Sequence, residues 1–352
     1  MKKTKVSIIG GGGYGAAEIL RNLVTREDVD ILRVSSKDYI GRPISKVHRA
    51  LAGHDDIIIQ DITPTECVEG ADVVFLAMPH VITAKVALEL LDLNVRIIDL
   101  SGDFRLQNIE DYQRDYAPKH PCPERLGSFV YGMPELNSEA IKSAKHVASP
   151  GCFATAISMG LLPLAASGLL NKSKISNVSM TGSSGSGVHP QLGTHHAIRA
   201  NNLKAYKILT HQHTSEISQT LTSAGAENIT LNFVPVSAPL VRGILAISQI
   251  DMPEGKTIDD IQKLYQDYYA SSSLVSITDI GVSPEIVAVA GTARVEIGLS
   301  IKEDIHSGIK TLCCITAIDN LIKGGAGQAI QSFNLMTGKS QDFGLHNPGL
   351  WP

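Results

Sequence analysis

The sequence predicts an α/β protein with two domains, the first built on a parallel, doubly wound sheet and the second of α+β type. Its 352 residues exceed the roughly 250–300 residues that one hydrophobic core normally supports. In the first half, short apolar segments alternate with helical ones, which is typical of a parallel sheet. From about Asn177 the apolar segments lengthen, so a mostly antiparallel sheet with helices on one face is expected.

The elements of the first domain follow from this alternation. Strands are expected at residues 5–9, 31–35, 73–77 and 96–100, with a helix at 84–93. For the second domain, strands are expected at 177–181, 230–236, 243–250 and 293–300, and helices at 216–223 and 257–269. Residues 318–336 return to helical spacing around Gly324 and Gly325. No repeat or flexible linker separates these parts, so the domains are expected to pack closely.

Composition is that of an ordinary soluble enzyme, with 43% hydrophobic and 19% charged residues. The 31 basic and 35 acidic residues give a net charge of -4 without any block of one sign, so neither nucleic acid nor an anionic membrane is an expected partner. No apolar run reaches the ~18 residues of a membrane span, and no secretory signal precedes the first strand. Five scattered cysteines do not form a disulfide framework. A cytoplasmic enzyme is expected.

A glycine cluster follows the first strand and opens the first helix. It consists of Gly10, Gly11, Gly12, Gly13, Tyr14 and Gly15, called here the glycine loop. Its spacing fits both G-x-G-x-x-G and the related G-x-x-G-x-x-A pattern ending at Ala16. Because bare N–H groups at a helix N-terminus can approach a pyrophosphate, this context predicts a Rossmann-type dinucleotide site. A plain structural turn is the alternative.

The end of the second strand bears on the choice of dinucleotide. NAD enzymes usually carry an acidic residue there for the ribose, whereas this chain has Ser35, Ser36 and Lys37. Two hydroxyl groups and a cation suit a 2′-phosphate, so NADP is the expected cofactor. An exposed lysine in a polar loop is the alternative reading of Lys37.

One cysteine has the setting of a nucleophile. Pro150 and Gly151 predict a sharp turn, and Cys152 then opens an apolar helix. A thiolate is the reactive form of cysteine, and a helix N-terminus favours it. For Cys67, Cys313 and Cys314 a buried, inert thiol is the expected state.

Histidines form a second group of candidate catalytic residues. His211 and His213 lie two residues apart, so on an extended segment they would share a face, and Thr214 or Ser215 could cap the helix that follows. Together with His195 and His196 they suggest acid–base catalysis. A zinc site and ordinary hydrogen-bonded histidines are the alternatives, and no cysteine pair or carboxylate completes a zinc ligand set. No metal is expected.

The stretch around Cys152 resembles the active-site signature of the N-acetyl-gamma-glutamyl-phosphate reductase family. The resemblance runs nearly end to end, over residues 10–18, 75–80, 98–106, 131–137, 211–217, 241–243 and 318–324. It implies an NADP-dependent, reversible reductive dephosphorylation of an acyl phosphate through a cysteine thioester. It also implies an NADP-binding domain made of residues 1–150 plus 318–352, a catalytic and oligomerisation domain of residues 151–317, and a homodimer or homotetramer.

The resemblance assigns roles to particular residues. Cys152 would be the nucleophile, with His213 a better candidate than His211 for the acid–base group. Besides the glycine loop and residues 35–37, the expected cofactor-binding residues are Pro79, His80, Ser101, Asn320 and Lys323. Arg105 and Arg242 are expected to hold phosphate or carboxylate by a bidentate fork.

The sequence departs from the common pattern of arginine-pathway members in three places. Gly12 replaces a usual serine, and Ala293 stands where relatives often have asparagine. The segment from His195 to Arg199 looks like the lysine-pathway branch, which reduces aminoadipyl phosphate held on an acidic carrier protein. Arg199 is therefore a candidate substrate residue, and the substrate is either an acetylated glutamyl phosphate or a carrier-bound aminoadipyl or glutamyl phosphate.

Two further classes fit part of the pattern. A cysteine hydrolase using Cys152 and His213 would have no use for the glycine loop or Lys37. A non-catalytic dinucleotide sensor would have no use for a cysteine placed at a helix start.

Overall fold

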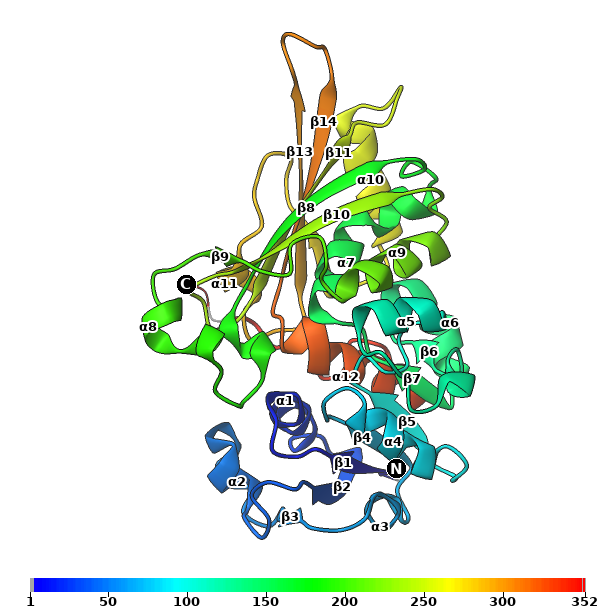
Figure 1. The fold of residues 1–352 in the computed structure, drawn as a ribbon, viewed down its shortest axis with the longest axis vertical. Coiled ribbons are helices and arrows are strands. Elements are labelled where there is room, and N and C mark those ends of the chain that lie inside the picture. Colours follow the sequence, from blue (N-terminus) through cyan, green and yellow to red (C-terminus); the bar gives the residue numbers. More distant parts are fainter. Residues whose placement is uncertain (1–2, 350, 352) are drawn as a thin grey trace. The chain divides into compact units, whose positions relative to one another are not determined.

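The computed structural model describes residues 3–349 and 351, which form two compact units (Figure 1). Unit 1 runs to Gly151 and also includes Gly325–Leu345, and unit 2 comprises Cys152–Gly324 and the residues from His346 onward. The second boundary lies after Gly324 rather than at residue 318, because Asp319 and Asn320 make their hydrogen bonds inside unit 2. Residues 346–349 and 351 group with unit 2, whereas the sequence prediction placed them in the first domain.

The core of unit 1 is a seven-stranded, wholly parallel sheet in the order β3-β2-β1-β4-β5-β7-β6. The strands are β1 (Thr4–Ile9), β2 (Val29–Ser35), β3 (Ile59–Gln60), β4 (Val73–Leu76), β5 (Arg96–Asp99), β6 (Val130–Tyr131) and β7 (His146–Ala148). The order reverses at β1, so the ends of β1 and β4 form the switch point at which such sheets bind ligands. The predicted doubly wound sheet is confirmed.

Helices of unit 1 connect and cover these strands. They are α1 (Tyr14–Leu23), α2 (Ile44–Val47), α3 (Pro64–Val68), α4 (Ile82–Leu90), α5 (Ile109–Asp115), α6 (Pro134–Ser143) and α12 (Gly327–Met336). Short 3-10 turns lie at Arg49–Leu51 and Pro123–Arg125. Although α12 comes from the far end of the chain, it packs into this unit. Phe333 lies 5.7 Å from Phe75 between ring centroids, and Arg26 donates to Asn334 at 2.6 Å.

Unit 2 is built on a mixed sheet in the order β12-β13-β14-β11-β8-β10-β9. The strands are β8 (Lys174–Thr181), β9 (Lys204–Ala205), β10 (Thr230–Ser237), β11 (Ile244–Asp251), β12 (Val275–Ile277), β13 (Val295–Glu303) and β14 (Lys310–Ile318). Only the β12–β13 and β8–β10 pairs are parallel, so the predicted mostly antiparallel sheet is confirmed. The strand β14 was not predicted; it ends at Ile318, so the expected helical stretch begins later, at Ile322.

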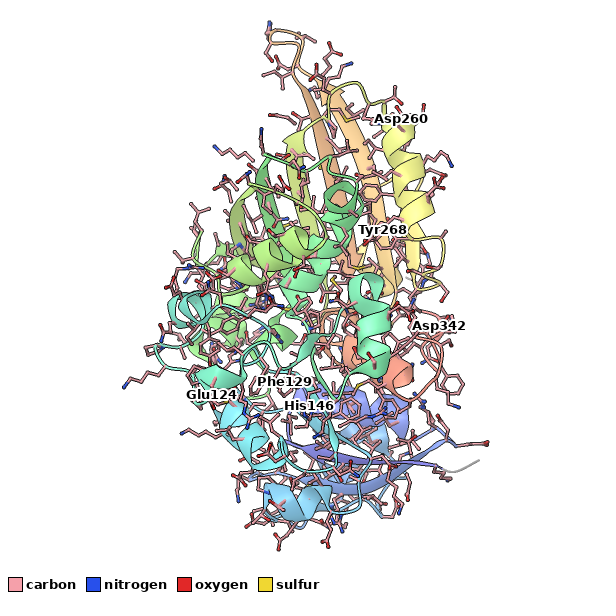
Figure 2. The ribbon with its side chains drawn as sticks, turned by 90° about the vertical axis from the view of Figure 1, so that its right-hand side faces the viewer. Glu124, Phe129, His146, Asp260, Tyr268 and Asp342 are labelled. Carbon is pink, nitrogen blue, oxygen red and sulfur yellow. The ribbon has the colours of Figure 1, made fainter. Side chains whose placement is uncertain are left out.

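The helices of unit 2 are α7 (Cys152–Ala166), α8 (His196–Arg199), α9 (His213–Ser223), α10 (Ile258–Tyr268) and α11 (Ile286–Val289). A π-helical turn spans Ile322–Ala326, and 3-10 turns lie at Ser183–Ser186 and Leu192–Thr194. In Figure 2, α10 carries Asp260 near its start and Tyr268 at its end, beside the strands of the sheet. Within the described residues, no helix is long and apolar enough to cross a membrane.

The helix α7 is buried along almost its whole length and contains Pro163. Proline has no N–H, so the carbonyl of Met159, four residues earlier, loses its helical partner. The hydroxyl of Tyr269 donates to that carbonyl at 2.6 Å, and Tyr265 donates to the carbonyl of Gly160 at 2.6 Å. These two phenols from the α10 region therefore stabilise α7 in the turn before Pro163, and the first residue of this helix is Cys152.

Candidate active site

The glycine loop is held against β2 in a conformation that requires glycine. Gly10 has φ +96°, and a Cβ atom there would lie 2.5 Å from the carbonyl oxygen of Ala77. The N–H groups of Gly10 and Gly11 both donate to the carbonyl of Ser35 at 2.9 Å. The helix α1 then starts at Tyr14 without a side-chain cap, so N–H groups of its first turn have no acceptor within the helix. This cradle fits the pyrophosphate of a dinucleotide.

Lys37 lies beside this loop, with a partner that the sequence did not reveal. Its side chain is 87% exposed and forms an ion pair with Asp61 at 2.9 Å. Ser36 accepts a hydrogen bond from the N–H of Asp38, and Ser35 is buried. The ring of Tyr39 covers Gly12, where an added Cβ atom would lie 3.2 Å away. Ser36 and Lys37 thus lie on a small polar surface next to the loop, whereas Ser35 is buried, and the role of all three at the 2′-phosphate stays a prediction.

The loop after β4 carries Pro79 and His80 and is fixed by Asp103. His80 accepts a hydrogen bond from the N–H of Gly102 at 2.7 Å. Both carboxylate oxygens of the buried Asp103 accept from the N–H of Val81, which has a φ of +68° and precedes α4. Asp103 therefore takes the place of a local helix cap and compensates a strained backbone.

Ser101, another predicted cofactor-binding residue, is hydrogen-bonded to a buried carboxyl group. Its N–H and its hydroxyl donate to the two oxygens of Asp99, at 2.7 and 2.9 Å. Burial raises the pKa of Asp99 to about 7, and the Asp103 charge adds to the rise. Ser101 is thus a structural hydrogen-bond donor, and its contact with cofactor stays a prediction.

Arg105 holds the turn before the cysteine, residues 149–151, called here the cysteine turn. The side chain is 6% exposed; its Nε donates to the carbonyl of Ser149 at 2.7 Å and its Nη2 to the carbonyl of Leu100 at 2.8 Å. The N–H of Ser149 donates to the carbonyl of Asp99 at 2.7 Å. Both main-chain groups of Ser149 are therefore fixed. Arg105 was expected to bind phosphate or carboxylate, and the structure gives it at least this second, structural role.

Cys152 is the first residue of α7, as predicted, and its side chain is partly buried. The positive end of the helix dipole is a favourable place for a thiolate. Gly324, in the π-helical turn, lies against it: an added Cβ atom would be 2.8 Å from the Cβ atom of Cys152. The thiol also lies close enough to Tyr206 to raise the pKa of that phenol, although burial is the larger cause.

His211 and His213 lie together in unit 2, but not as predicted. The helix α9 begins at His213, so the pair does not sit on an extended segment, and neither Thr214 nor Ser215 caps the helix. Instead the N–H of His213 donates to Nδ1 of His211 at 3.1 Å, and the ring centroids are 4.7 Å apart. Both rings meet the ring of Phe153, the residue after the cysteine.

The pKa of His211 is strongly lowered. Burial, followed by the neighbouring His213, lowers the pKa of His211 to about 2. Because Nδ1 of His211 accepts a hydrogen bond, its Nε2 carries the proton of a neutral ring. His211 is therefore neutral at physiological pH and serves to orient His213.

The predicted arginines are anchored to the main chain or to an acid. Arg199 donates from Nη2 to the carbonyl of Thr181 at 2.9 Å, and its Nε is buried without a hydrogen-bond partner among the described residues. Burial lowers the pKa of Arg199, and the nearby Tyr206 opposes that shift. Arg242 pairs with the fully buried Asp319 at 3.6 Å. In unit 2, Arg199 and Cys152 thus both lie near Tyr206.

Asn320 and Lys323 were expected to bind cofactor. Asn320 accepts from the N–H of Gly243 at 2.7 Å and donates to the hydroxyl of Ser184 at 3.1 Å, both within unit 2. Lys323 is fully buried in the π-helical turn. Their structural contacts are clear, and their contact with cofactor stays a prediction. Among the described residues, no group of three or more histidine, cysteine or acidic side chains is arranged to hold a metal ion.

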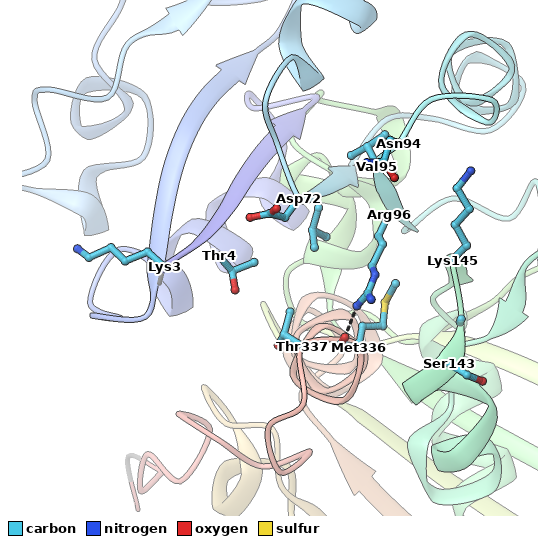
Figure 3. Close-up of a pocket in the computed structure, with 12 residues that line it drawn as sticks. Lys3, Thr4, Asp72, Asn94, Val95, Arg96, Ser143, Lys145, Met336 and Thr337 are labelled. Carbon is cyan, nitrogen blue, oxygen red and sulfur yellow. Dashed lines mark hydrogen bonds between the residues drawn. The ribbon is translucent and has the colours of Figure 1, made fainter. Parts of the chain in front are cut away.

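A cavity of about 630 Å³ opens at the opposite edge of the unit 1 sheet (Figure 3). It is lined where strands begin, by Thr4, Val73 and Arg96 among others, and Arg96 donates to the carbonyl of Met336 at the end of α12. The glycine loop follows the carboxyl end of β1. The cavity lining therefore includes no residue of the glycine loop.

Comparison with known proteins agrees with this architecture. Residues 5–144 match the family described as semialdehyde dehydrogenase, NAD binding domain, and residues 152–320 match semialdehyde dehydrogenase, dimerisation domain. Aspartate semialdehyde dehydrogenase II from Vibrio cholerae superposes with a TM-score of 0.72 at 17% identity, covering 96% of this chain and 99% of that one. Fold and site thus define a two-domain oxidoreductase of the semialdehyde dehydrogenase type.

Closer relatives identify the family. The chain is 36% identical, over 99% of both chains, to N-acetyl-gamma-glutamyl-phosphate reductase of Pelotomaculum thermopropionicum. It is also 36% identical, over 97% of both, to the [LysW]-L-2-aminoadipate/[LysW]-L-glutamate phosphate reductase of Saccharolobus solfataricus. The chain belongs to the N-acetyl-gamma-glutamyl-phosphate reductase family and is an acyl-phosphate reductase. The cysteine hydrolase and the non-catalytic sensor are thereby excluded.

Proposed function

We propose that this enzyme reduces N-acetyl-gamma-glutamyl phosphate to N-acetylglutamate semialdehyde and phosphate, with NADPH, in arginine biosynthesis. The observation that carries the proposal is the placement of Cys152 at the start of α7, in a chain whose glycine loop fits a dinucleotide. Full-length similarity to reductases of this name supports it.

The residues of unit 2 account for the covalent steps. Cys152 Sγ attacks the acyl carbon, the C–O bond to phosphate breaks, and phosphate leaves with the electron pair. His213, oriented by the neutral His211, accepts the thiol proton and returns it when the thiolate later departs. Bound NADPH supplies the hydride that converts the thioester to the aldehyde. Arg199 and Arg242 are the candidate anchors for anionic groups of the substrate.

A carrier-bound aminoadipyl or glutamyl phosphate is the second candidate substrate. The distribution of charge favours this candidate. Residues 140–215 contain no aspartate or glutamate, whereas they include the cations Arg199, Lys204 and Lys207. Exposed apolar side chains accompany these cations, including Leu192 and Leu203, which are 79% and 65% exposed. A cationic and partly apolar surface suits an acidic protein partner. The Saccharolobus relative, whose name includes such a carrier, is as similar as the acetyl-type relatives.

Three further features belong to the proposal. NADP is favoured over NAD by Lys37 and by the absence of an acidic residue at the end of β2. A homodimer or homotetramer is supported by the match to a dimerisation domain. A cytoplasmic location is supported by the five cysteines, all of which are free.

The decisive experiment is the reverse reaction, NADP reduction in the presence of phosphate. N-acetylglutamate semialdehyde, its homologue with one more carbon, and carrier-bound glutamate and aminoadipate semialdehydes should be compared by kcat/KM. Efficient turnover of the free acetylated five-carbon substrate supports the first candidate. Turnover only with carrier-bound substrates would overturn it in favour of the second, and replacing NADP by NAD tests the cofactor in the same assay.

A further inference from the structure

A histidine from a distant segment reaches the glycine loop. Nε2 of His48 lies 2.7 Å from the carbonyl oxygen of Gly11, 37 residues earlier in the chain. A carbonyl oxygen can only accept, so Nε2 of His48 carries the hydrogen and donates it. No motif in the sequence pointed to this residue.

This hydrogen bond fixes the orientation of one peptide unit. In a trans peptide, the carbonyl and the following N–H point in opposite directions. With the carbonyl of Gly11 directed at His48, the N–H of Gly12 must point away from His48. The N–H of Gly11 is already held by the carbonyl of Ser35 at 2.9 Å. The direction of the Gly12 N–H, one of the donors expected to face the pyrophosphate, therefore depends on His48.

The loop needs such a restraint because of its composition. Glycine residues on both sides of the Gly11–Gly12 peptide let the backbone reach φ values of either sign, so this peptide can turn over at little cost. The segment that carries His48 is itself held in place by buried side chains and a main-chain hydrogen bond. Ile44 and Leu51, on either side of it, are buried, and the N–H of Ile44 donates to the carbonyl of Ile57 at 2.9 Å.

We infer that His48 is a positioning residue for dinucleotide binding, which acts by holding the Gly11–Gly12 peptide in one orientation. It acts through the loop and not by touching the reacting atoms. Since the pyrophosphate is common to both nicotinamide dinucleotides, loss of the hydrogen bond from His48 must weaken the binding of NADPH and NADH to the same extent. A residue acting at the 2′-phosphate end would weaken NADPH alone.

The test compares His48→Ala with His48→Gln, because the glutamine amide can place a donor where Nε2 of histidine lies. The dissociation constants for NADPH and NADH are measured by fluorescence titration of the enzyme without substrate. We expect His48→Ala to weaken both by about tenfold, the scale of one lost hydrogen bond, and His48→Gln to stay within about threefold of wild type. His54→Ala, a histidine six residues further along the chain whose side chain makes no hydrogen bond to the glycine loop among the described residues, is the matched control and should leave both constants unchanged.

Two additional readouts separate positioning from general damage. The melting temperature and the rate of Cys152 alkylation by iodoacetamide in the cofactor-free enzyme should match wild type in all three variants. Unchanged dinucleotide affinity in His48→Ala would overturn the inference. So would an equal loss in His48→Gln, or a loss accompanied by a lower melting temperature, since either result would make the role of His48 one of packing. None of these measurements depends on which acyl phosphate is the substrate.

Discussion

Gly324 lies directly against Cys152, because an added Cβ atom would stand 2.8 Å from the Cβ and 3.1 Å from the Cα of the cysteine. Real Cβ atoms essentially never approach that closely. The π-helical turn Ile322–Ala326 therefore passes the nucleophile at a distance that only a residue without a side chain allows. The absence of a side chain at this position is a requirement of the site.

The first prediction follows from this contact. Gly324→Ala should displace Cys152, lower kcat at least tenfold and slow alkylation of the thiol, because overpacking of this kind costs about 1–3 kcal/mol. Gly193→Ala is the control, since an added Cβ atom there meets no atom within 4 Å. Wild-type kcat in Gly324→Ala would show that the turn gives way and leaves the thiol in place.

The second prediction concerns the nucleophile itself. Cys152→Ser should abolish turnover, because a serine hydroxyl at this position lacks the nucleophilicity of a thiolate. Dinucleotide affinity should remain, since the glycine loop belongs to unit 1. Steady-state assays and fluorescence titration measure the two properties separately. Retention of a tenth of wild-type activity is incompatible with the assigned role.

The third prediction is a pH dependence of stability caused by His211. Its folded-state pKa of about 2 lies below the ordinary histidine value of 6.5, so between these values the unfolded chain binds a proton that the folded chain does not. The stabilising contribution is therefore complete above pH 6.5 and is lost as pH falls below it, by at most about 1.4 kcal/mol per pH unit. His211→Gln should make the decline in the free energy of unfolding between pH 6.5 and 5 shallower by up to that slope. Denaturant titrations at several pH values test this, and an unchanged slope would contradict it.

The fourth prediction uses the ion pair between Lys37 and Asp61. Lys37→Asp should weaken NADPH by about 1–3 kcal/mol and leave NADH nearly unchanged, if the lysine reads the 2′-phosphate. Asp61→Asn should instead strengthen NADPH binding, because it frees Lys37 from a competing carboxylate. Exposed pairs are worth about 0–1 kcal/mol, so a gain of up to about fivefold in NADPH affinity is expected. Equal responses of NADPH and NADH would place the 2′-phosphate elsewhere.

The fifth prediction distinguishes the substrates at Arg199. Arg199→Glu should raise KM for a carrier-bound substrate far more than for a free acetylated one, and the difference should shrink at high salt, because salt screens the attraction between Arg199 and an acidic carrier over ~8–10 Å. Arg199→Lys keeps the charge and is the control for the hydrogen bond to Thr181. If Arg199→Glu leaves KM for the carrier-bound substrate unchanged, Arg199 does not contribute to binding of the carrier.

Sequence patterns predicted those features that depend on neighbours along the chain. The glycine loop between β1 and α1, and Cys152 after a Pro-Gly turn at the start of α7, are local signals of this kind. A wrong local prediction was the helix cap after His213, since the hydroxyl of Thr214 is instead buried without a hydrogen-bond partner among the described residues. Thr214 has the composition of a cap but lies one position inside the helix.

Sequence patterns do not predict contacts between residues that lie far apart along the chain. His48 meets Gly11 over 37 residues, Asp61 meets Lys37 over 24, and Gly324 meets Cys152 from the opposite end of unit 2. Each depends on the register of strands and the path of loops, which single-sequence periodicity does not encode. Arg105 shows the same limit, because its motif indicated a ligand-binding arginine and only the fold reveals its bonds to Ser149 and Leu100.

The packing of α12 on unit 1 has a consequence for how the chain folds during synthesis. The first 151 residues leave the ribosome without the helix that supplies Phe333 and Asn334 to their core, and that helix follows only after all of residues 152–324. Domains usually fold in the order in which they are made, but here the second unit is an insertion within the first. Until residue 336 emerges, the parallel sheet exposes the apolar surface around Phe75. The nascent chain should therefore stay bound to chaperones until α12 has emerged, and truncation before α12 should leave unit 1 prone to aggregation while unit 2 folds.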